Sequence, residues 1–163
     1  MTIEYLKSGK PDAERAEDDA KTKVIVEEIL KSIEIDGDTA VRELSAKFDN
    51  YSPENFKLTE KEISDLIASL SDRELSDIKF AQEQVRNFAK AQRDSMLDIE
   101  IETIPGVILG HKNIPVQSVG CYVPGGKFPM VASAHMSIAT ATVAGVPRIV
   151  ACTPPFEGKP NAA

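Results

Sequence analysis

The sequence predicts an α/β protein: a helical N-terminal region over residues 1–96, then a β-hairpin and the first βαβ unit of an incomplete, Rossmann-like parallel sheet over residues 97–163. Three observations predict this class. Apolar residues recur every three to four positions over the first hundred residues, as on one face of a helix. Apolar and charged residues then alternate from Leu97, as on a strand. The segment from Val119 to Thr153 reads as strand, glycine loop, helix and strand.

The first expected helix covers Asp12 to Ile33, and its apolar stripe comprises Ile25, Val26, Ile29, Leu30 and Ile33. Gly37 interrupts this pattern, and Asp38 is expected to cap a second short helix because aspartate side chains accept hydrogen bonds from free amides at helix starts. The second helix presents four apolar residues, Ala40, Val41, Leu44 and Phe48.

Two further helix starts carry the capping-box pattern, in which a hydroxyl and a carboxylate three residues apart satisfy each other's backbone amides. They are Thr59 with Glu62 and Ser71 with Glu74. After the second box a long helix is expected, which runs through Leu75, Ile78, Ala81, Val85, Phe88 and Gln92. A helix of this length needs a continuous partner surface, so it is the best candidate for packing against something outside this chain.

After Leu97 the spacing of apolar residues changes from every three to four positions to every second position. Ile99 and Ile101 alternate with carboxylates, Pro105-Gly106 is a turn dipeptide, and an apolar strand returns to His111, which together predict an antiparallel hairpin. Ser118 to Val123 is expected to form the first strand of the parallel unit. An alanine-rich helix follows from about Met130, with Gly145 as its C-terminal stop, and a second strand covers Arg148 to Thr153.

The glycine loop Pro124-Gly125-Gly126 suggests ligand binding, because glycines permit tight turns and a close approach of backbone to a ligand. Ligands of such sheets bind beyond the carboxyl ends of the strands, which places Tyr122 to Lys127 and Thr153 to Pro155 at one edge. The Gly-x-Gly-x-x-Gly dinucleotide fingerprint is absent, however, and Pro-Gly-Gly is a turn in many proteins. From the residues alone, a cofactor loop and a simple structural turn both stay open.

Composition excludes several classes. The formal charge of −7, from 26 acidic and 19 basic residues, disfavours nucleic-acid binding, and no apolar run is long enough to span a bilayer. The start of the chain lacks the features of a secretory signal, which predicts a cytoplasmic protein.

Cys121 and Cys152 are expected in buried strands as small hydrophobic residues. His111 and His135 have no second ligand nearby, so packing or capping roles are favoured over catalytic or metal-binding ones.

Several of these segments resemble the histidinol dehydrogenase family. They include Gly120-Cys-Tyr-Val-Pro-Gly-Gly126, the upstream Pro105-Gly-Val-Ile-Leu-Gly110, the downstream Thr153-Pro-Pro155 and the early Asp36-Gly-Asp-Thr-Ala40. The resemblance runs from about Lys23 to the last residue and covers the N-terminal portion of the family. It implies a zinc-dependent, NAD-linked, homodimeric cytoplasmic enzyme that oxidises a small-molecule primary alcohol through an aldehyde to a carboxylate.

The resemblance also implies site residues. The tyrosine of the family's Tyr-Val-Pro-Gly-Gly motif contacts NAD and corresponds to Tyr122, and Gly125 and Gly126 are expected to contact the cofactor as well. The family's zinc ligands and acid/base pair belong to its later half. No catalytic residue and no metal ligand is therefore expected in this chain, and the fragment alone is expected to be inactive.

One departure concerns the substrate. After the glycine loop, members that oxidise histidinol usually carry a Ser-Ser-Val-Leu-Met-like run, whereas this chain reads Lys127-Phe-Pro-Met-Val-Ala-Ser. That version is closer to the branch that oxidises sulfopropanediol, so both alcohols stay open as substrates.

The alternative to an enzyme is a non-catalytic module for ligand binding or dimerisation. The ending from Gly158 to Ala163 is similar to a helix start without its helix, which predicts continuation of the chain.

Overall fold

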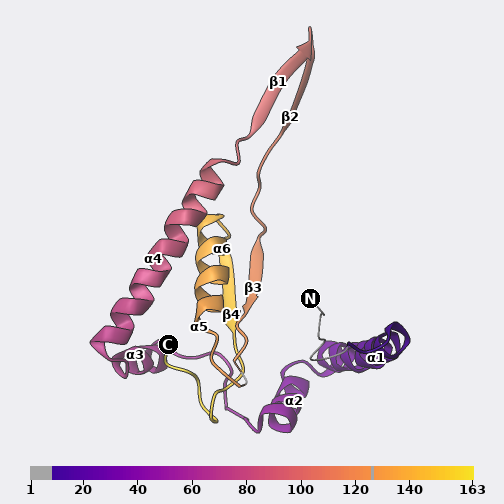
Figure 1. Ribbon diagram of the computed structural model, residues 1–163, viewed down its shortest axis with the longest axis vertical. Coiled ribbons are helices and arrows are strands. Elements are labelled where there is room, and N and C mark those ends of the chain that lie inside the picture. Colours follow the sequence, from indigo (N-terminus) through magenta and orange to yellow (C-terminus); the bar gives the residue numbers. More distant parts are fainter. Residues whose placement is uncertain (1–8, 126) are drawn as a thin grey trace, which may run out of the picture. The chain divides into compact units, whose positions relative to one another are not determined.

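The computed structural model describes residues 9–125 and 127–163. The chain divides after Pro53 into two compact units, which are described separately below and whose elements are labelled in Figure 1. The predicted boundary at residue 96 lies where helices give way to strands, between the last residue of α4, Asp94, and the first of β1, Ile99. As a boundary between domains it stays a prediction.

The first unit contains two consecutive helices, α1 (Asp12–Asp36) and α2 (Asp38–Asp49). Gly37 separates them as predicted: its φ of 56° suits glycine, and its N–H donates to the Ile33 carbonyl at 2.9 Å. The prediction that Asp38 caps α2 is wrong. Gly37 itself occupies the capping position and Asp38 is the first helical residue, because the two helices follow each other without a linker.

The second unit begins with α3 (Glu60–Ala68) and α4 (Asp72–Asp94). Both predicted capping boxes are confirmed. The Glu62 amide donates to the Thr59 hydroxyl at 3.2 Å, while the Thr59 amide donates to the Glu62 carboxylate at 2.7 Å. The same exchange joins Ser71 and Glu74, at 3.3 Å and 2.9 Å. These reciprocal bonds fix where the two helices begin.

The predicted hairpin is formed by β1 (Ile99–Ile104) and β2 (Val107–His111), which pair in antiparallel register with Ile99 opposite His111. Gly106 has a φ of 83° at the turn. At the base of the hairpin, the Asp98 carboxylate accepts bonds from the Asn113 backbone amide at 2.9 Å and from its side chain at 3.1 Å. Every hairpin residue is exposed, and in Figure 1 the hairpin extends beyond the end of α4.

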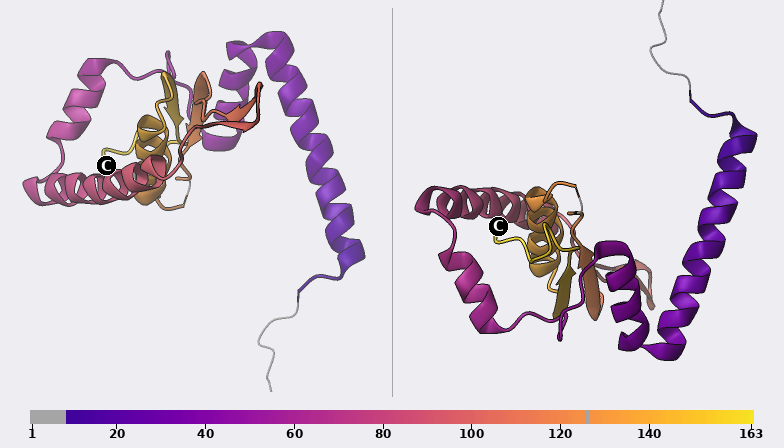
Figure 2. Two further views of the ribbon diagram at one scale, coloured as in Figure 1. Left: turned by 90° about the horizontal axis from the view of Figure 1, so that it is seen from above. Right: turned by 90° about the horizontal axis from the view of Figure 1, so that it is seen from below.

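The predicted βαβ unit is also present. β3 (Ser118–Tyr122) and β4 (Arg148–Cys152) pair in parallel register. A crossover helix joins them, composed of α5 (Val131–Ala134), the π-helical segment η1 (His135–Ala139) and α6 (Thr140–Val143), with Gly145 at a φ of 83° just after it. In Figures 1 and 2 the crossover helix lies between α4 and the β3–β4 sheet.

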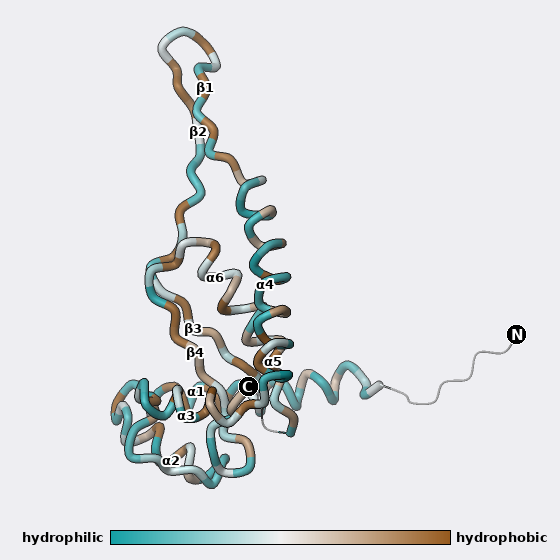
Figure 3. Tube along the Cα trace, turned by 90° about the vertical axis from the view of Figure 1, so that its left-hand side faces the viewer, coloured by the Kyte–Doolittle hydropathy of each residue, from teal (hydrophilic) through white to brown (hydrophobic). Residues whose placement is uncertain are grey.

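The buried apolar side chains of the described residues are few and small: Ala40, Ala89, Cys121 and Ala139. The long helix runs through Phe88 as predicted, but Phe88 is not on its packed face. Phe88 is 68% exposed, whereas Ala89, four residues after Val85, continues the stripe. Figure 3 shows hydrophobic residues concentrated along β3 and β4 and a mixture of both kinds along α4.

The prediction that both cysteines are buried holds for Cys121 and is wrong for Cys152. Successive strand residues point to opposite faces, and Cys152 pairs with Tyr122, so these two share the face opposite to that of Cys121. In the described part of the second unit, the crossover helix covers only the Cys121 face. No helix among the described residues combines the length and the apolar character needed to cross a membrane.

Candidate functional site

The candidate site lies at the carboxyl ends of β3 and β4. The two strands end level with each other, at the pair Tyr122 and Cys152. One further bond, from the Val123 amide to the Cys152 carbonyl at 2.8 Å, continues the pairing beyond the strands. Tyr122 to Pro124 and Thr153 to Pro154 therefore leave the sheet together, as expected for the ligand-binding edge of a parallel sheet.

The glycine loop is closed by its own backbone. The Met130 amide donates to the Pro124 carbonyl at 3.1 Å, and the Ser133 amide then donates to the Met130 carbonyl at 2.9 Å, where the crossover helix begins. Between these points the chain leaves the sheet and returns within a few residues. The loop is thus held at both ends, and within it Lys127 and Phe128 are exposed.

Gly125 packs directly on the segment that follows β4. A Cβ atom added to Gly125 would lie 3.0 Å from the Thr153 hydroxyl and 3.4 Å from a Pro154 ring carbon. The residue is buried, so the close approach predicted for this glycine is made to the neighbouring protein segment. The prediction that the two loops share one edge is confirmed by this contact. Gly126, the other predicted glycine, lies outside the described residues.

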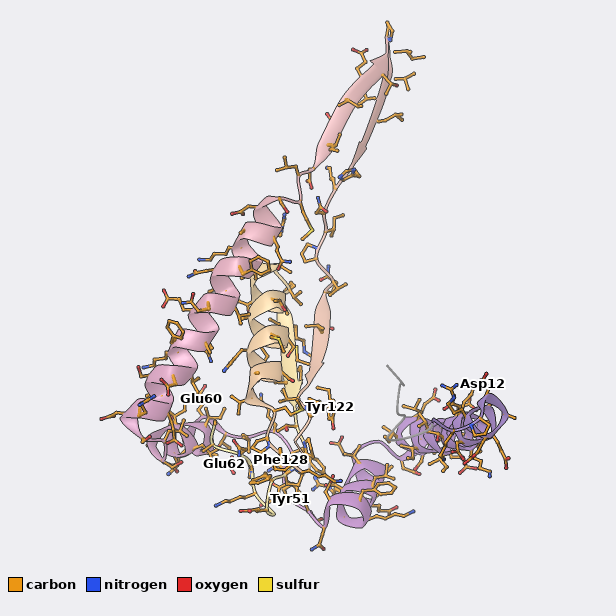
Figure 4. All side chains as sticks on the ribbon, in the orientation of Figure 1. Asp12, Tyr51, Glu60, Glu62, Tyr122 and Phe128 are labelled. Atoms are coloured by element: carbon orange, nitrogen blue, oxygen red, sulfur yellow. The ribbon has the colours of Figure 1, made fainter. Side chains whose placement is uncertain are left out.

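Tyr122 is the predicted cofactor contact, and its ring is 63% exposed. Phe128 is more exposed still, at 78%, and Figure 4 places both aromatic side chains at the end of the sheet from which the loop emerges. Aromatic rings that face solvent beside a loop offer flat surfaces on which a ring of a ligand can stack. Sequence reasoning selected Tyr122 but missed Phe128, whose signal is an aromatic residue two positions after the glycine pair.

An open groove runs along β3 beside this edge. Its volume is about 460 Å³. It is lined on one side by β3 and on the other by the crossover helix, chiefly by Val119, Gly120, Tyr122, Ser137, Thr140 and Ala144. Because the crossover helix lines it, this groove lies on the Cys121 face of the sheet, whereas the Tyr122 side chain lies on the opposite face. Tyr122 is 63% exposed there, so the bend is not sealed by packed side chains.

The crossover helix contains an irregularity that the sequence did not predict. Its middle turn is the π-helical segment η1, and hydroxyl groups bond back to carbonyls around it, including Ser137 to the Ser133 carbonyl at 2.7 Å and Thr142 to the Ile138 carbonyl at 2.8 Å. Such back-bonding widens or bends helices. His135 opens this segment and is half buried. The only sequence signal was the series of serines and threonines between Ser133 and Thr142.

The charge around the site differs from that of the rest of the chain. Residues 103–156 contain no aspartate or glutamate, and their basic residues are Lys112, Lys127 and Arg148. The carboxyl groups with displaced pKa values, Glu62, Glu74 and Asp98, all precede this segment. The glycine loop thus lies in a sequence segment without carboxylates in an otherwise acidic protein, which suits an anionic ligand.

The described residues do not fit a zinc site. Among residues 9–125 and 127–163, no three side chains of histidine, cysteine, aspartate or glutamate come together as metal ligands. His111 lies on the hairpin, where its ring nitrogen contacts the Leu97 carbonyl at 3.1 Å, while His135 lies on the crossover helix. Structural and catalytic zinc ions need three or four such ligands.

Comparison with known proteins gives a consistent result. The model of the histidinol dehydrogenase family matches residues 12–163. A histidinol dehydrogenase homolog from Shouchella clausii is 55% identical over 160 residues, and the sulfopropanediol 3-dehydrogenase of Ruegeria pomeroyi is 43% identical over 158 residues. These matches cover 98% and 97% of this chain, which spans 38% and 36% of the two relatives.

The fold agrees with the sequence comparison. The crystal structure of histidinol dehydrogenase from Elizabethkingia anophelis superposes with a TM-score of 0.80 at 26% identity, over 97% of this chain and 34% of that one. The helical first part, the hairpin and the parallel strand pair therefore occur together in a solved member of the family. From the family match over nearly its whole length, this chain belongs to the histidinol dehydrogenase family.

Proposed function

We propose that this chain is the N-terminal part of an NAD-linked dehydrogenase that oxidises a primary alcohol through an aldehyde to a carboxylate. The observation that carries the proposal is the Tyr122 edge: in a member of this family, an exposed tyrosine and a glycine loop lie at the carboxyl ends of two parallel strands. Within this proposal, Tyr122, Gly125 and Gly126 form part of the NAD-binding site.

Tyr122 and Gly125 each have a physical role in the proposal. The exposed ring of Tyr122 offers a stacking surface, and Gly125 keeps the loop close to Thr153, so that the loop backbone stays near the sheet edge. Bound NAD would supply the hydride acceptor for both oxidation steps. The segment around the loop contains no aspartate or glutamate, so it does not repel the phosphates of the cofactor.

The remaining parts of the proposal concern the full-length protein. Its zinc ligands and its acid/base groups are assigned to residues outside this chain, since the described residues do not form a metal site. We further propose a cytoplasmic homodimer with a small-molecule alcohol as substrate. The chain spans 36–38% of the two relatives named above, which leaves most of such an enzyme to be supplied by further sequence.

Two substrates follow from the relatives, histidinol and sulfopropanediol. The named sulfopropanediol dehydrogenase is 43% identical to this chain, and the histidinol dehydrogenase of Methanosarcina barkeri is 37% identical over 139 residues. The loop sequence from Lys127 to Ser133 also favours the sulfonated diol. We therefore propose the sulfonated diol as the first substrate to test.

The experiment compares two proteins, the 163-residue chain and the full-length protein that contains it. Each is incubated with NAD and zinc and with either histidinol or dihydroxypropanesulfonate, and NADH formation is followed by absorbance. We expect NADH from the full-length protein with one of the alcohols and none from the chain alone. Turnover by the chain alone would refute the assignment of the reacting groups to the missing part, and no turnover by either protein would favour the non-catalytic module.

A further inference from the structure

Carboxylates are distributed unevenly along this chain, and the site lies where they are absent. The chain as a whole has a formal charge of −7, yet the segment between Glu102 and Glu157 contains no acidic residue. Its three basic residues are Lys112, Lys127 and Arg148. A stretch of this length without a carboxylate in an acidic protein leaves any cation within it unneutralised by its sequence neighbours.

Only one of these three cations is placed at the site. Lys112 follows the hairpin strand β2, and Arg148 opens β4, where it pairs with Ser118 at the amino ends of the two strands. Lys127 instead lies in the loop that the bond from Met130 to Pro124 closes, at the carboxyl ends of the strands. It is therefore the cation of this segment whose backbone lies at the same edge as Tyr122.

Lys127 is close enough to that edge of the sheet for its side chain to reach a ligand bound there. Two residues of chain span at most about 7 Å, so the Cα of Lys127 lies within that distance of Gly125, which itself contacts Thr153. A lysine side chain adds several ångströms of reach and three hydrogen-bond donors at its end. Lys127 is exposed, next to the exposed ring of Phe128.

An ordinary surface lysine would also be exposed, and four of the 13 lysines in this chain form ion pairs among the described residues. Lys21, Lys23 and Lys61 each form an ion pair with a carboxylate four residues away on the same helix, and Lys10, just before α1, pairs with Glu14. Lys127 forms no ion pair with any carboxylate of residues 9–125 and 127–163, including Glu157, the first one beyond Pro154. Its charge is thus available to a ligand at the edge.

We propose that Lys127 is a specificity-determining residue that binds an anionic substituent of the alcohol substrate, such as a sulfonate. This inference rests on the dehydrogenase function proposed above. A lysine at this position would attract a sulfonate and repel histidinol, whose amine is cationic at neutral pH. The phosphates of NAD share the same anionic chemistry, so the experiment must separate the substrate from the cofactor as the partner of Lys127.

The test uses the full-length protein with Lys127→Met, and with Lys112→Met as a matched control that removes the same charge from the hairpin end. Rates are measured with dihydroxypropanesulfonate and with the neutral propane-1,2-diol, at varied NAD concentration. We expect Lys127→Met to lower kcat/KM for the sulfonate about tenfold or more, because a charge-assisted hydrogen bond is lost. The neutral diol, the KM for NAD and the control variant are expected to stay unchanged, and Lys127→Arg is expected to restore most of the rate.

Two results would overturn the inference. An equal loss with both diols together with a raised KM for NAD would assign Lys127 to the cofactor's phosphates, and an unchanged kcat/KM for the sulfonate would leave Lys127 without a role. Calorimetric binding of dihydroxypropanesulfonate to the NAD-loaded protein separates this inference from the proposed function. If Lys127→Met binds the sulfonate more weakly than the parent protein and neither protein turns it over, the proposed role of Lys127 is supported and the dehydrogenase function is refuted. Equal binding by the two proteins would refute the role of Lys127.

Discussion

At the scale of single residues, Tyr122 is the side chain on which the proposed cofactor site depends most. It ends β3, shares a strand face with Cys152 and is largely exposed. A ring in this position contributes by stacking, and stacking of a base on an aromatic side chain contributes about 1–3 kcal/mol. The hydroxyl adds a hydrogen bond only if a polar group of the ligand reaches it.

Replacement of Tyr122 by alanine is therefore expected to raise the KM for NAD of the full-length protein about tenfold, which corresponds to about 1.4 kcal/mol. Tyr122→Phe keeps the ring and is expected to retain most of the affinity. Tyr51→Ala, in the first compact unit, serves as the control. Steady-state kinetics at saturating alcohol provide the measurement, and an unchanged KM in Tyr122→Ala would show that the cofactor binds elsewhere.

Gly125 and Gly120 form a second comparison at this scale. A methyl group on Gly125 would meet Thr153 and Pro154 at 3.0–3.4 Å, whereas one on Gly120 would meet nothing within 4 Å. We expect Gly125→Ala to destabilise the chain by about 1–3 kcal/mol through overpacking, and Gly120→Ala to change its stability by less than about 0.5 kcal/mol. Denaturant unfolding followed by circular dichroism measures both. Equal stabilities of the two variants would contradict the close packing of the loop.

The parts of the site that could be predicted from sequence are those where a residue type favours one kind of backbone conformation. Pro124 and Gly125 predicted a bend that approaches its neighbour closely, and Gly125 does so against Thr153. Burial was less predictable. Cys121 and Cys152 occupy similar apolar strands, but alternation puts them on opposite faces, and the crossover helix covers only one of these faces. A two-stranded sheet therefore does not bury both cysteines.

At the scale of secondary-structure elements, the capping boxes make the starts of α3 and α4 sensitive to pH. The hydroxyl and amide of Ser71 hold the pKa of Glu74 below its ordinary value of 4.5, and the amide and hydroxyl of Thr59 do the same for Glu62. A carboxyl group whose pKa is lowered by folding stabilises the helix start above its unfolded pKa. That contribution is lost as the pH falls through the lowered, folded value.

Ser71→Ala removes the hydroxyl from one box and leaves the other intact. We expect the pKa of Glu74 to rise toward its ordinary value while that of Glu62 stays lowered, and Thr59→Ala to give the reverse result. Titration of the side-chain carboxyl carbons by NMR measures both values in the chain, since each box spans only four residues. If the two pKa values responded equally to both substitutions, a general effect on the fold would account for them better than the local hydrogen bonds.

The base of the hairpin also contains a hydrogen-bonded carboxylate whose pKa is lowered. The Asn113 backbone amide and, next, its side chain keep the pKa of Asp98 low, with a smaller contribution from the positive charge of Arg93. Asp98→Ala is expected to increase hydrogen exchange of the β1 and β2 amides at neutral pH, because the connection across the base is lost. Exchange measured by NMR in the wild type should rise in the same way as the pH falls through the folded pKa of Asp98. Unchanged exchange in Asp98→Ala would contradict this role.

Element types were easier to predict than their details. Capping boxes, Gly37 and the Pro105-Gly106 turn carry local chemistry that decides where a helix or hairpin begins and ends. The π-helical turn from His135 was missed because a widened turn leaves the apolar repeat almost unchanged. Phe88 lies on the predicted long helix but is exposed, whereas Ala89 has the better spacing from Val85 and allows the crossover helix to approach closely.

At the scale of the whole molecule, the described residues bury few apolar side chains. The buried ones are small, while 26 large hydrophobic residues are exposed, among them Phe80 and Phe88 on α4. Monomeric proteins rarely leave so much apolar surface in contact with water, because each exposed side chain forgoes about 1.5–3 kcal/mol of burial. The fold class was predictable from local patterns, but no local pattern specifies which apolar residues meet a partner surface.

This exposure predicts that the 163-residue chain associates with itself in solution. Sedimentation equilibrium is expected to show an apparent mass that rises with concentration. The double substitution Phe80→Ser and Phe88→Ser should reduce that rise, since it removes two exposed aromatic side chains from α4 without touching its packed stripe. Arg86→Ser and Lys90→Ser, at exposed charged positions of the same helix, should not reduce it. A parent chain that stays monomeric at every concentration would show that these phenylalanines are tolerated in water and do not drive association.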